Sequence, residues 1–231
     1  MAGENPEPIP NQIDDETLRE QIAGLAPETR AGWTELIASI LLALATVATA
    51  WSGYQAARWG GVQATRYAQA STARIESTRA STSGGQLVQI DVGLFTEFVN
   101  AFAEGDEDLM NFYQERFREE FVPAFEAWMA TDPVNNPEAP KGPFEMPEYV
   151  VSDFERADEL EVEAGRFFDE ANAANETSDL YILNTVVLAS VLFFAGLIAR
   201  FKSNLARYII LLAAIAMLAV GVFNLFIFPI E

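Results

Sequence analysis

Two residue types are missing from this chain, and their absence excludes several kinds of chemistry. Its 231 residues contain no cysteine and no histidine. Disulfides, thiol nucleophiles, Cys/His zinc sites, histidine-ligated haem and serine–histidine triads are therefore excluded. A metal site made only of carboxylates remains open, but acidic residues are common on solvated helices and are a weak signal. We expect no catalytic residue, no cofactor and no metal, and hence no enzyme.

Positive charge is also scarce, because 14 Lys and Arg residues stand against 34 Asp and Glu residues. The tail 1–32 has seven acids and two arginines (net −5), and the segment 53–177 has 24 acids and nine bases (net −15). Such acidic parts repel nucleic acid and anionic lipid headgroups, so neither is an expected partner. Solubility is the simplest explanation of the excess, and a docking face for a basic partner is the alternative.

Three long segments contain no charged residue at all. They are residues 36–57, 180–199 and 208–230, with lengths of 22, 20 and 23 residues. A helix rises about 1.5 Å per residue, so each segment is long enough to cross a hydrocarbon core of about 30 Å. We therefore expect an integral membrane protein with three spans, whose main surroundings are a lipid bilayer.

The chain divides accordingly into six parts. We expect an acidic flexible N-terminal tail over 1–32, an acidic helical extramembrane domain over 58–178, a short basic loop over 201–207, and transmembrane helices over 33–57, 179–200 and 208–230. Prolines at the start of the tail predict an extended segment. Residues 13–24 have the spacing of a short amphipathic helix.

The orientation follows from Lys and Arg in short loops, which stay on the cytoplasmic side. The loop between the second and third spans carries Arg200, Lys202 and Arg207 and no acid. This places the N-terminus in the cytoplasm and residues 58–178 on the other side of a bacterial inner or plasma membrane. Three arginines soon after the first span argue the other way, but they belong to a long insert, for which the rule has less force.

Small side chains form a row along the first span and beyond it. The row has i+4 spacing and consists of Ala45, Thr49, Gly53, Ala57, Gly61 and Thr65. Such a ridge lets a second helix approach closely, and in lipid this packing drives helix association. Alanine-rich helices also produce rows by chance, but six in succession favour a real contact ridge. Its partner is either another span of this chain or a neighbouring subunit.

The first half of the insert has a helical pattern. Residues 62–80 contain no Pro or Gly, and Ser83-Gly84-Gly85 then predicts a kink or break. An apolar stripe with helical spacing follows over 86–103. It consists of Leu87, Ile90, Leu94, Phe98 and Phe102. Asp91 lies beside this stripe, and its simplest interpretation is a carboxylate at the helix edge that reaches water.

A row of large side chains at i+4 spacing marks residues 109–128 as an amphipathic helix. The row consists of Leu109, Tyr113, Phe117, Phe121 and Phe125. We expect this apolar face to pack in a core, with a partner's groove as the alternative. Gly105-Asp106-Glu107-Asp108 predicts a turn and an N-cap before the helix. Pro123 should kink or restart it.

Five prolines in residues 132–149 predict an irregular strap, held onto the helices by Phe144, Met146 and Tyr149. A further helix over 152–177 leads directly into the second span. Two long helices, which continue the first and second spans, would then lie antiparallel as a stalk. The expected fold class is an all-α integral membrane protein with three transmembrane helices and a helical extramembrane stalk or domain between spans one and two.

Three segments of the sequence resemble a known family. They are Trp51-Ser-Gly-Tyr-Gln-Ala-Ala-Arg-Trp59, FYQERFREEFVPAFEAWMATDPVNNPEAP (112–140) and FFAGLIARF (193–201). They are similar to a family of uncharacterised three-span bacterial membrane proteins with a helical insert between spans one and two, a domain of unknown function. The resemblance covers roughly residues 33–229 and leaves the acidic tail outside. It implies the topology described above and carries no catalytic signature.

The uncharged segments 36–57, 180–199 and 208–230 carry no acidic or basic side chain, whereas coupled transporters usually place some within the bilayer. Their deep polar side chains are mild, and interhelical hydrogen bonds explain them. These are Ser39, Thr46, Thr49, Asn184, Thr185, Ser190 and Asn224.

We therefore expect a non-enzymatic structural or accessory membrane protein. It would self-associate as a homo-oligomer or join other subunits of a larger membrane complex. One alternative is an oligomeric ion channel or pore, lined by the small-residue face of span one, with the acidic insert gathering cations at its mouth. Another alternative is a membrane sensor that relays signals to the cytoplasmic tail.

Overall fold

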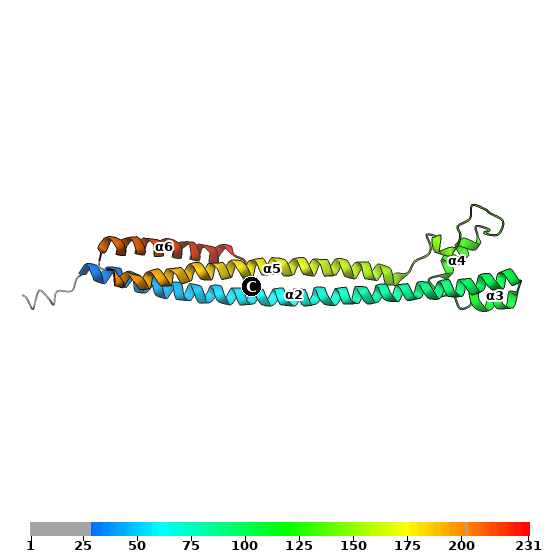
Figure 1. The fold of residues 1–231 in the computed structure, drawn as a ribbon, viewed down its shortest axis with the longest axis horizontal. Coiled ribbons are helices and arrows are strands. Elements are labelled where there is room, and N and C mark those ends of the chain that lie inside the picture. Colours follow the sequence, from blue (N-terminus) through cyan, green and yellow to red (C-terminus); the bar gives the residue numbers. More distant parts are fainter. Residues whose placement is uncertain (1–28, 202) are drawn as a thin grey trace, which may run out of the picture. The chain divides into compact units, whose positions relative to one another are not determined.

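The computed structural model describes residues 29–201 and 203–231, in which the regular structure is helical and no strand occurs (Figure 1). The elements are α2 (Thr29–Glu104), α3 (Glu107–Gln114), α4 (Val122–Met129), η1 (Pro143–Glu145), α5 (Ser152–Leu197), η2 (Ile198–Arg200) and α6 (Asn204–Ile227). The expected all-α class is thus confirmed for this part of the chain. The amphipathic helix over 13–24 and the tail as far as residue 28 lie outside the described residues, and residues 29–32 already belong to α2.

Helices α2, α5 and α6 each contain a stretch that is long and apolar enough to cross a membrane. At most 28% of the residues in such a stretch are buried within the structure. Many large apolar side chains therefore point outward, for example Val47 (70% exposed), Leu212 (69%) and Phe226 (85%). Helices that present apolar side chains to their surroundings are suited to lipid. These three helices are the ones that the uncharged segments predict.

The described chain forms two compact units. The three-helix unit contains residues 29–58 and 177–231, and the acidic unit contains residues 59–176. The acidic unit falls within segment 58–178, for which the sequence predicts an extramembrane domain.

Small and aliphatic side chains fill the core of the three-helix unit. On α2 seven buried residues alternate at spacings of four and three, namely Thr34, Ala38, Leu41, Ala45, Ala48, Ser52 and Gln55, and Ala56 next to them is buried as well. This alternation is the heptad seam of a coiled coil. It packs in one cluster with residues of α5, such as Leu188 and Val191, and of α6, such as Ala214.

A glycine sets the approach of α6 to α5. A Cβ built on Gly221 would lie 2.5 Å from Cδ2 and 2.9 Å from Cγ of Leu188, which is fully buried. A side chain at this position of α6 would require Leu188 to shift.

The acidic unit contains an antiparallel hairpin of α2 and α5. Gln63 donates to Asn175, Tyr67 donates to Asn172, and Ser77 donates to the carbonyl of Ala157. Residue numbers rise on one helix as they fall on the other, so the two helices run in opposite directions side by side (Figure 1). Buried alanines dominate the seam, namely Ala70 and Ala73 on α2 and Ala157, Ala164, Ala171 and Ala174 on α5.

The break predicted at Ser83-Gly84-Gly85 is wrong, because α2 continues through these residues without interruption. Gly84 is buried, and a Cβ built on it would lie 2.9 Å from Cε1 of the Phe154 ring on α5. The glycine makes room for an aromatic ring of the neighbouring helix instead of ending its own. Gly85 has no atom within 4 Å of a built Cβ.

The single helix expected over 109–128 is divided in two by a turn. The expected N-cap is confirmed, because Asp106 accepts a hydrogen bond from the backbone N–H of Leu109 at 3.0 Å, and Gly105 before it has a φ of 71°. Helix α3 ends at Gln114, and α4 restarts with Pro123 in its first turn, where proline's missing N–H costs nothing. The predicted restart at Pro123 is therefore confirmed.

Candidate functional site

Three side chains of the predicted aromatic row form part of the hydrophobic core of the acidic unit. Phe117, Phe121 and Phe125 are buried with Phe98 in one cluster, whereas Leu109 and Tyr113 are half-buried. The strap closes this cluster, because Phe144 stacks on Phe121 at 5.4 Å between ring centroids and Tyr149 meets Phe121 edge-on at 5.9 Å. Aromatic pairs at such distances add to the stability that their burial already provides.

Asp91 is fully buried beside this aromatic cluster. Arg118 donates to both of its carboxylate oxygens, from Nη2 to Oδ2 at 2.8 Å and from Nε to Oδ1 at 3.3 Å. The Tyr149 hydroxyl donates to Oδ2 at 3.1 Å. The expectation of a carboxylate that reaches water at the helix edge is therefore wrong. A buried charge needs such partners, and the fork of an arginine matches both oxygens of a carboxylate.

A second carboxylate extends this network towards α5. Arg118 also pairs with Glu120, which accepts a hydrogen bond from the Ser152 hydroxyl at 2.6 Å. Ser152 is the first residue of α5. The network therefore joins α2, the turn after α3, the strap and α5.

The charges of this network shift the acidities of its members. The hydrogen bond from Arg118 to Asp91 is the main reason that the pKa of the guanidinium is raised. The hydrogen bond from Ser152 is the main reason that the pKa of Glu120 is lowered. Burial, followed by the negative charge of Asp91, raises the pKa of Tyr149 to about 12. At neutral pH the network therefore holds charged Arg118 and Glu120 and a neutral phenol.

The small-residue ridge has a different place on α2. Ala45 is buried, Thr49 is half-buried, and the other four residues (Gly53, Ala57, Gly61 and Thr65) are exposed. A row at i+4 spacing turns by about 40° around the helix at each step, because a helix has about 3.6 residues per turn. The row therefore leaves the buried heptad seam. A Cβ built on Gly53 or Gly61 would meet no atom within 4 Å.

A polar network joins all three helices of the three-helix unit. The amide of Asn184 on α5 donates to the Ser52 hydroxyl of α2 at 3.3 Å and to the Gly221 carbonyl of α6 at 3.1 Å. Its oxygen accepts a hydrogen bond from Asn224 at 3.0 Å. The Ser52 hydroxyl in turn donates to the carbonyl of Tyr181 at 3.0 Å. Interhelical bonding is thus confirmed for Asn184 and Asn224.

Five hydroxyls for which the sequence predicted interhelical bonds behave differently, and that prediction is wrong for them. Each donates to the carbonyl four residues earlier in its own helix, and this holds for Ser39, Thr46, Thr49, Thr185 and Ser190. A short side chain in a helix reaches its own backbone without a partner helix.

The segment after α6 is tied to α2 by a side-chain amide. The Gln55 amide donates to the carbonyl of Glu231 at 3.3 Å and accepts from its N–H at 3.0 Å. The Arg58 guanidinium lies 3.7 Å from the Glu231 carboxylate, and the Tyr181 hydroxyl donates to the carbonyl of Pro229 at 3.2 Å. A fully buried glutamine is thereby satisfied at both ends of its amide.

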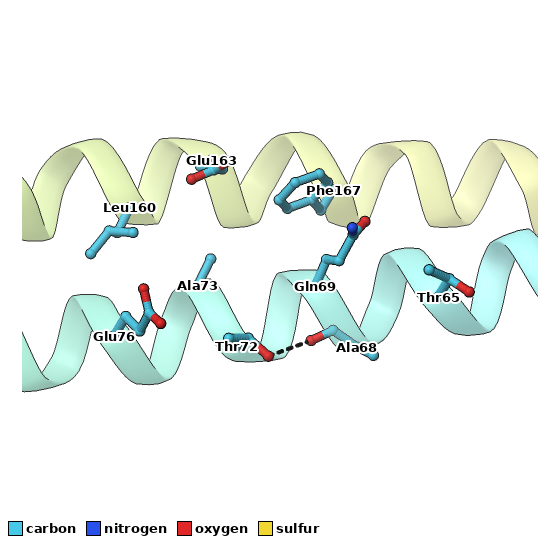
Figure 2. A pocket seen from close by; sticks show the side chains of 9 residues that line it. All are labelled: Thr65, Ala68, Gln69, Thr72, Ala73, Glu76, Leu160, Glu163 and Phe167. Carbon is cyan, nitrogen blue, oxygen red and sulfur yellow. Dashed lines mark hydrogen bonds between the residues drawn. The ribbon is translucent and has the colours of Figure 1, made fainter.

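An open groove of about 360 Å³ runs along the hairpin of the acidic unit. Figure 2 shows Leu160, Glu163 and Phe167 on α5 facing a row of α2 side chains from Thr65 to Glu76. The ionisable groups among its lining residues are Glu76 and Glu163, which come from opposite helices. Within residues 29–201 and 203–231, no group of three or more acids is placed to hold a metal ion.

Comparisons of this chain with protein-family profiles, with curated proteins and with solved structures found no match. The resemblance to three-span bacterial membrane proteins therefore stays a prediction.

Proposed function

We propose that this chain is a non-enzymatic structural or accessory protein of a bacterial inner membrane. The three-helix unit would span the bilayer with the N-terminus in the cytoplasm. Residues 58–178 would form a helical stalk and domain on the other side. The three positive charges near the junction of the second and third spans (Arg200, Lys202 and Arg207) support this orientation, and the family resemblance supports the topology.

The proposal depends on one observation, the exposure of small residues on α2 within the three-helix unit. Gly53 and Ala57 lie outside the heptad seam, and nothing in this unit fills the space in front of Gly53. In lipid there is little hydrophobic driving force between helices, so close packing of small residues is what favours association. This face of α2 therefore suits self-association or docking onto another membrane subunit.

The use of the buried polar groups supports a structural role. Asp91 of α2 bonds to Arg118 in the turn after α3, and Asn184 of α5 bonds to the Gly221 carbonyl of α6. Across the described chain, no buried side-chain nitrogen or oxygen lacks a hydrogen-bond partner. Groups that act on a substrate usually lie in a cleft with perturbed pKa values and free bonding capacity, whereas these groups hold the fold together.

The test is the mass of the full chain after gentle extraction in a nonionic detergent. We expect a discrete oligomer or a stoichiometric companion subunit. Gly53→Leu combined with Ala57→Leu should reduce the assembly to a single chain, because the added side chains keep a partner helix away. Val47→Leu is the matched control, since Val47 is 70% exposed on the same helix but lies off the ridge. A monomer without companions in the wild type would contradict the proposal.

The channel and sensor alternatives stay predictions. A channel would be lined by the small-residue face of α2, which includes the Thr49 hydroxyl. This hydroxyl donates to the Ala45 carbonyl of its own helix at 2.6 Å. Ion flux through the purified chain in liposomes is the measurement that tests the channel.

A further inference from the structure

A small apolar cavity lies at the edge of the aromatic core of the acidic unit. Its volume is about 170 Å³. Phe98 and Trp128 line it together with residues that are partly open to solvent, namely Val99 (39% exposed), Phe102 (43%), Met129 (39%) and Val134 (66%). The cavity is therefore built from the C-terminal end of α2, from α4 and from the segment that follows α4.

The size of the cavity limits what it can hold. Pockets for whole small molecules measure about 300–1,000 Å³, so this one is too small for them. A dry apolar cavity of about 150 Å³ takes a single benzene ring in another protein. One aromatic or leucine side chain therefore fits this cavity, as the anchor residues of protein interfaces fit their pockets.

The charge around the cavity restricts the source of that side chain. The two segments that build it, 97–104 and 126–138, contain five acids and no lysine or arginine. All of these acids are exposed or at the surface, and they are Glu97, Glu104, Glu126, Asp132 and Glu138. A second copy of this unit would bring the same negative charge, and an anionic lipid surface would also be repelled. A cationic occupant is attracted.

We propose that this cavity, whose two segments carry exposed acids and no base, binds a cationic segment of a partner protein, which inserts one large apolar side chain flanked by lysines or arginines. The apolar side chain displaces water from Phe102 and Val134, and the flanking cations are attracted by the exposed carboxylates of segments 97–104 and 126–138. The apolar contact determines the affinity, and the charges mainly raise the association rate.

This inference deepens the proposed accessory role by naming the chemistry of one partner. It concerns the acidic unit alone and makes no use of the α2 ridge. The ridge variant Gly53→Leu/Ala57→Leu should therefore leave peptide binding unchanged, so the two proposals fail separately.

The experiment compares two peptides of equal charge, KKAFAKKA and KKAAAKKA, by titration calorimetry on the full chain in a nonionic detergent. We expect the phenylalanine peptide to bind at least about tenfold more tightly, which corresponds to about 1.4 kcal/mol. Added salt should weaken both peptides to the same extent, because it screens the charges that they share. Equal affinities would mean attraction by charge alone and would overturn the proposal.

Two variants locate the binding. Val134→Gln and Phe102→Gln should each abolish the advantage of the phenylalanine peptide. Val162→Gln is the matched control, because Val162 is 75% exposed on α5 of the same unit and does not line the cavity. Circular dichroism confirms that each variant keeps its helices. If Val134→Gln and Phe102→Gln retain the full preference, the phenylalanine binds elsewhere and the proposal is wrong.

Discussion

Arg118 donates hydrogen bonds to both carboxylate oxygens of Asp91, and the Asp91 side chain is fully buried. Replacing Arg118 by methionine would leave a buried carboxylate with Tyr149 as its remaining donor. We expect the acidic unit to lose about 3–5 kcal/mol of stability, as is usual when one partner of a buried ion pair is removed. The measurement is denaturant unfolding of the full chain in detergent, followed by circular dichroism.

Arg116→Met is the control for this loss. Arg116 is exposed, and it donates to the Phe112 carbonyl and lies over the Phe112 ring at 3.4 Å. An exposed contact of this kind contributes only about 0.5–1 kcal/mol. The double variant Asp91→Leu/Arg118→Met should recover much of the stability, because it removes the buried charge as well. Equal losses for the two arginines would show that burial of the pair has no energetic consequence.

Alkaline pH should weaken the same network through Tyr149. Burial and the charge of Asp91 raise its pKa in the folded chain to about 12, above the ordinary value of 10.0. The folded state therefore favours the neutral phenol. This contribution is complete below pH 10.0 and is lost as the pH rises towards about 12.

Tyr149→Phe tests this dependence. The variant lacks the ionising group, so its stability should fall less than that of the wild type between pH 10.0 and about 12. Denaturant unfolding at a series of pH values gives the comparison, and a spectrophotometric titration should show one late-ionising tyrosine fewer in the variant. Parallel stability curves would contradict the assignment.

The parts that the sequence predicts well are those in which the deciding residues are neighbours along the chain. The uncharged segments predict three apolar helices because length and composition alone decide them. Asp106 and Pro123 predict a cap and a restart because each acts within one helical turn. The glycine pair at 84 and 85 could not be interpreted in this way. Its effect depends on Phe154, which belongs to the other helix of the hairpin.

The surroundings of a buried polar group are likewise decided by residues that are distant in the sequence. The residues near Asp91 in its own helix predict a surface acid. Its partners Arg118 and Tyr149 are distant along the chain, and the fold brings them to it. The predicted ridge on α2 follows a row at i+4 spacing, which winds around a helix, while a heptad seam stays on one side. The seam packs against the chain's own helices, and Ala45 is the one ridge residue that it shares.

The two glycines in the spans of α5 and α6 should respond to alanine in opposite ways. Gly221→Ala places a methyl group against the buried Leu188 and should cost about 1–3 kcal/mol, as overpacking usually does. Gly196→Ala meets no atom within 4 Å and should be neutral or stabilising by up to about 1 kcal/mol, because alanine favours helices. Thermal unfolding in detergent compares the two variants. A similar response in both would mean that α6 does not approach α5 through Gly221.

Asn184 joins α2, α5 and α6, the three helices that are apolar enough to cross a membrane, so its replacement should loosen all of them together. Asn184→Leu removes donations to Ser52 and to the Gly221 carbonyl and leaves the Asn224 amide without its acceptor. Hydrogen bonds between helices in a membrane contribute about 0.6 kcal/mol each on average and at most about 2 kcal/mol. The loss of all three bonds should therefore cost about 2–4 kcal/mol once the cost of the stranded groups is included.

Ser190→Ala is the matched control for Asn184→Leu on the same helix. The Ser190 hydroxyl donates to the Val186 carbonyl of its own helix at 2.9 Å, so its removal breaks no contact between helices. We expect a change of less than about 0.5 kcal/mol, which is typical of surface positions. Unfolding of the full chain in mixed micelles with an increasing fraction of anionic detergent gives both values. If Asn184→Leu is as stable as Ser190→Ala, the hydrophobic packing of α2, α5 and α6 holds the unit together without help from its polar centre.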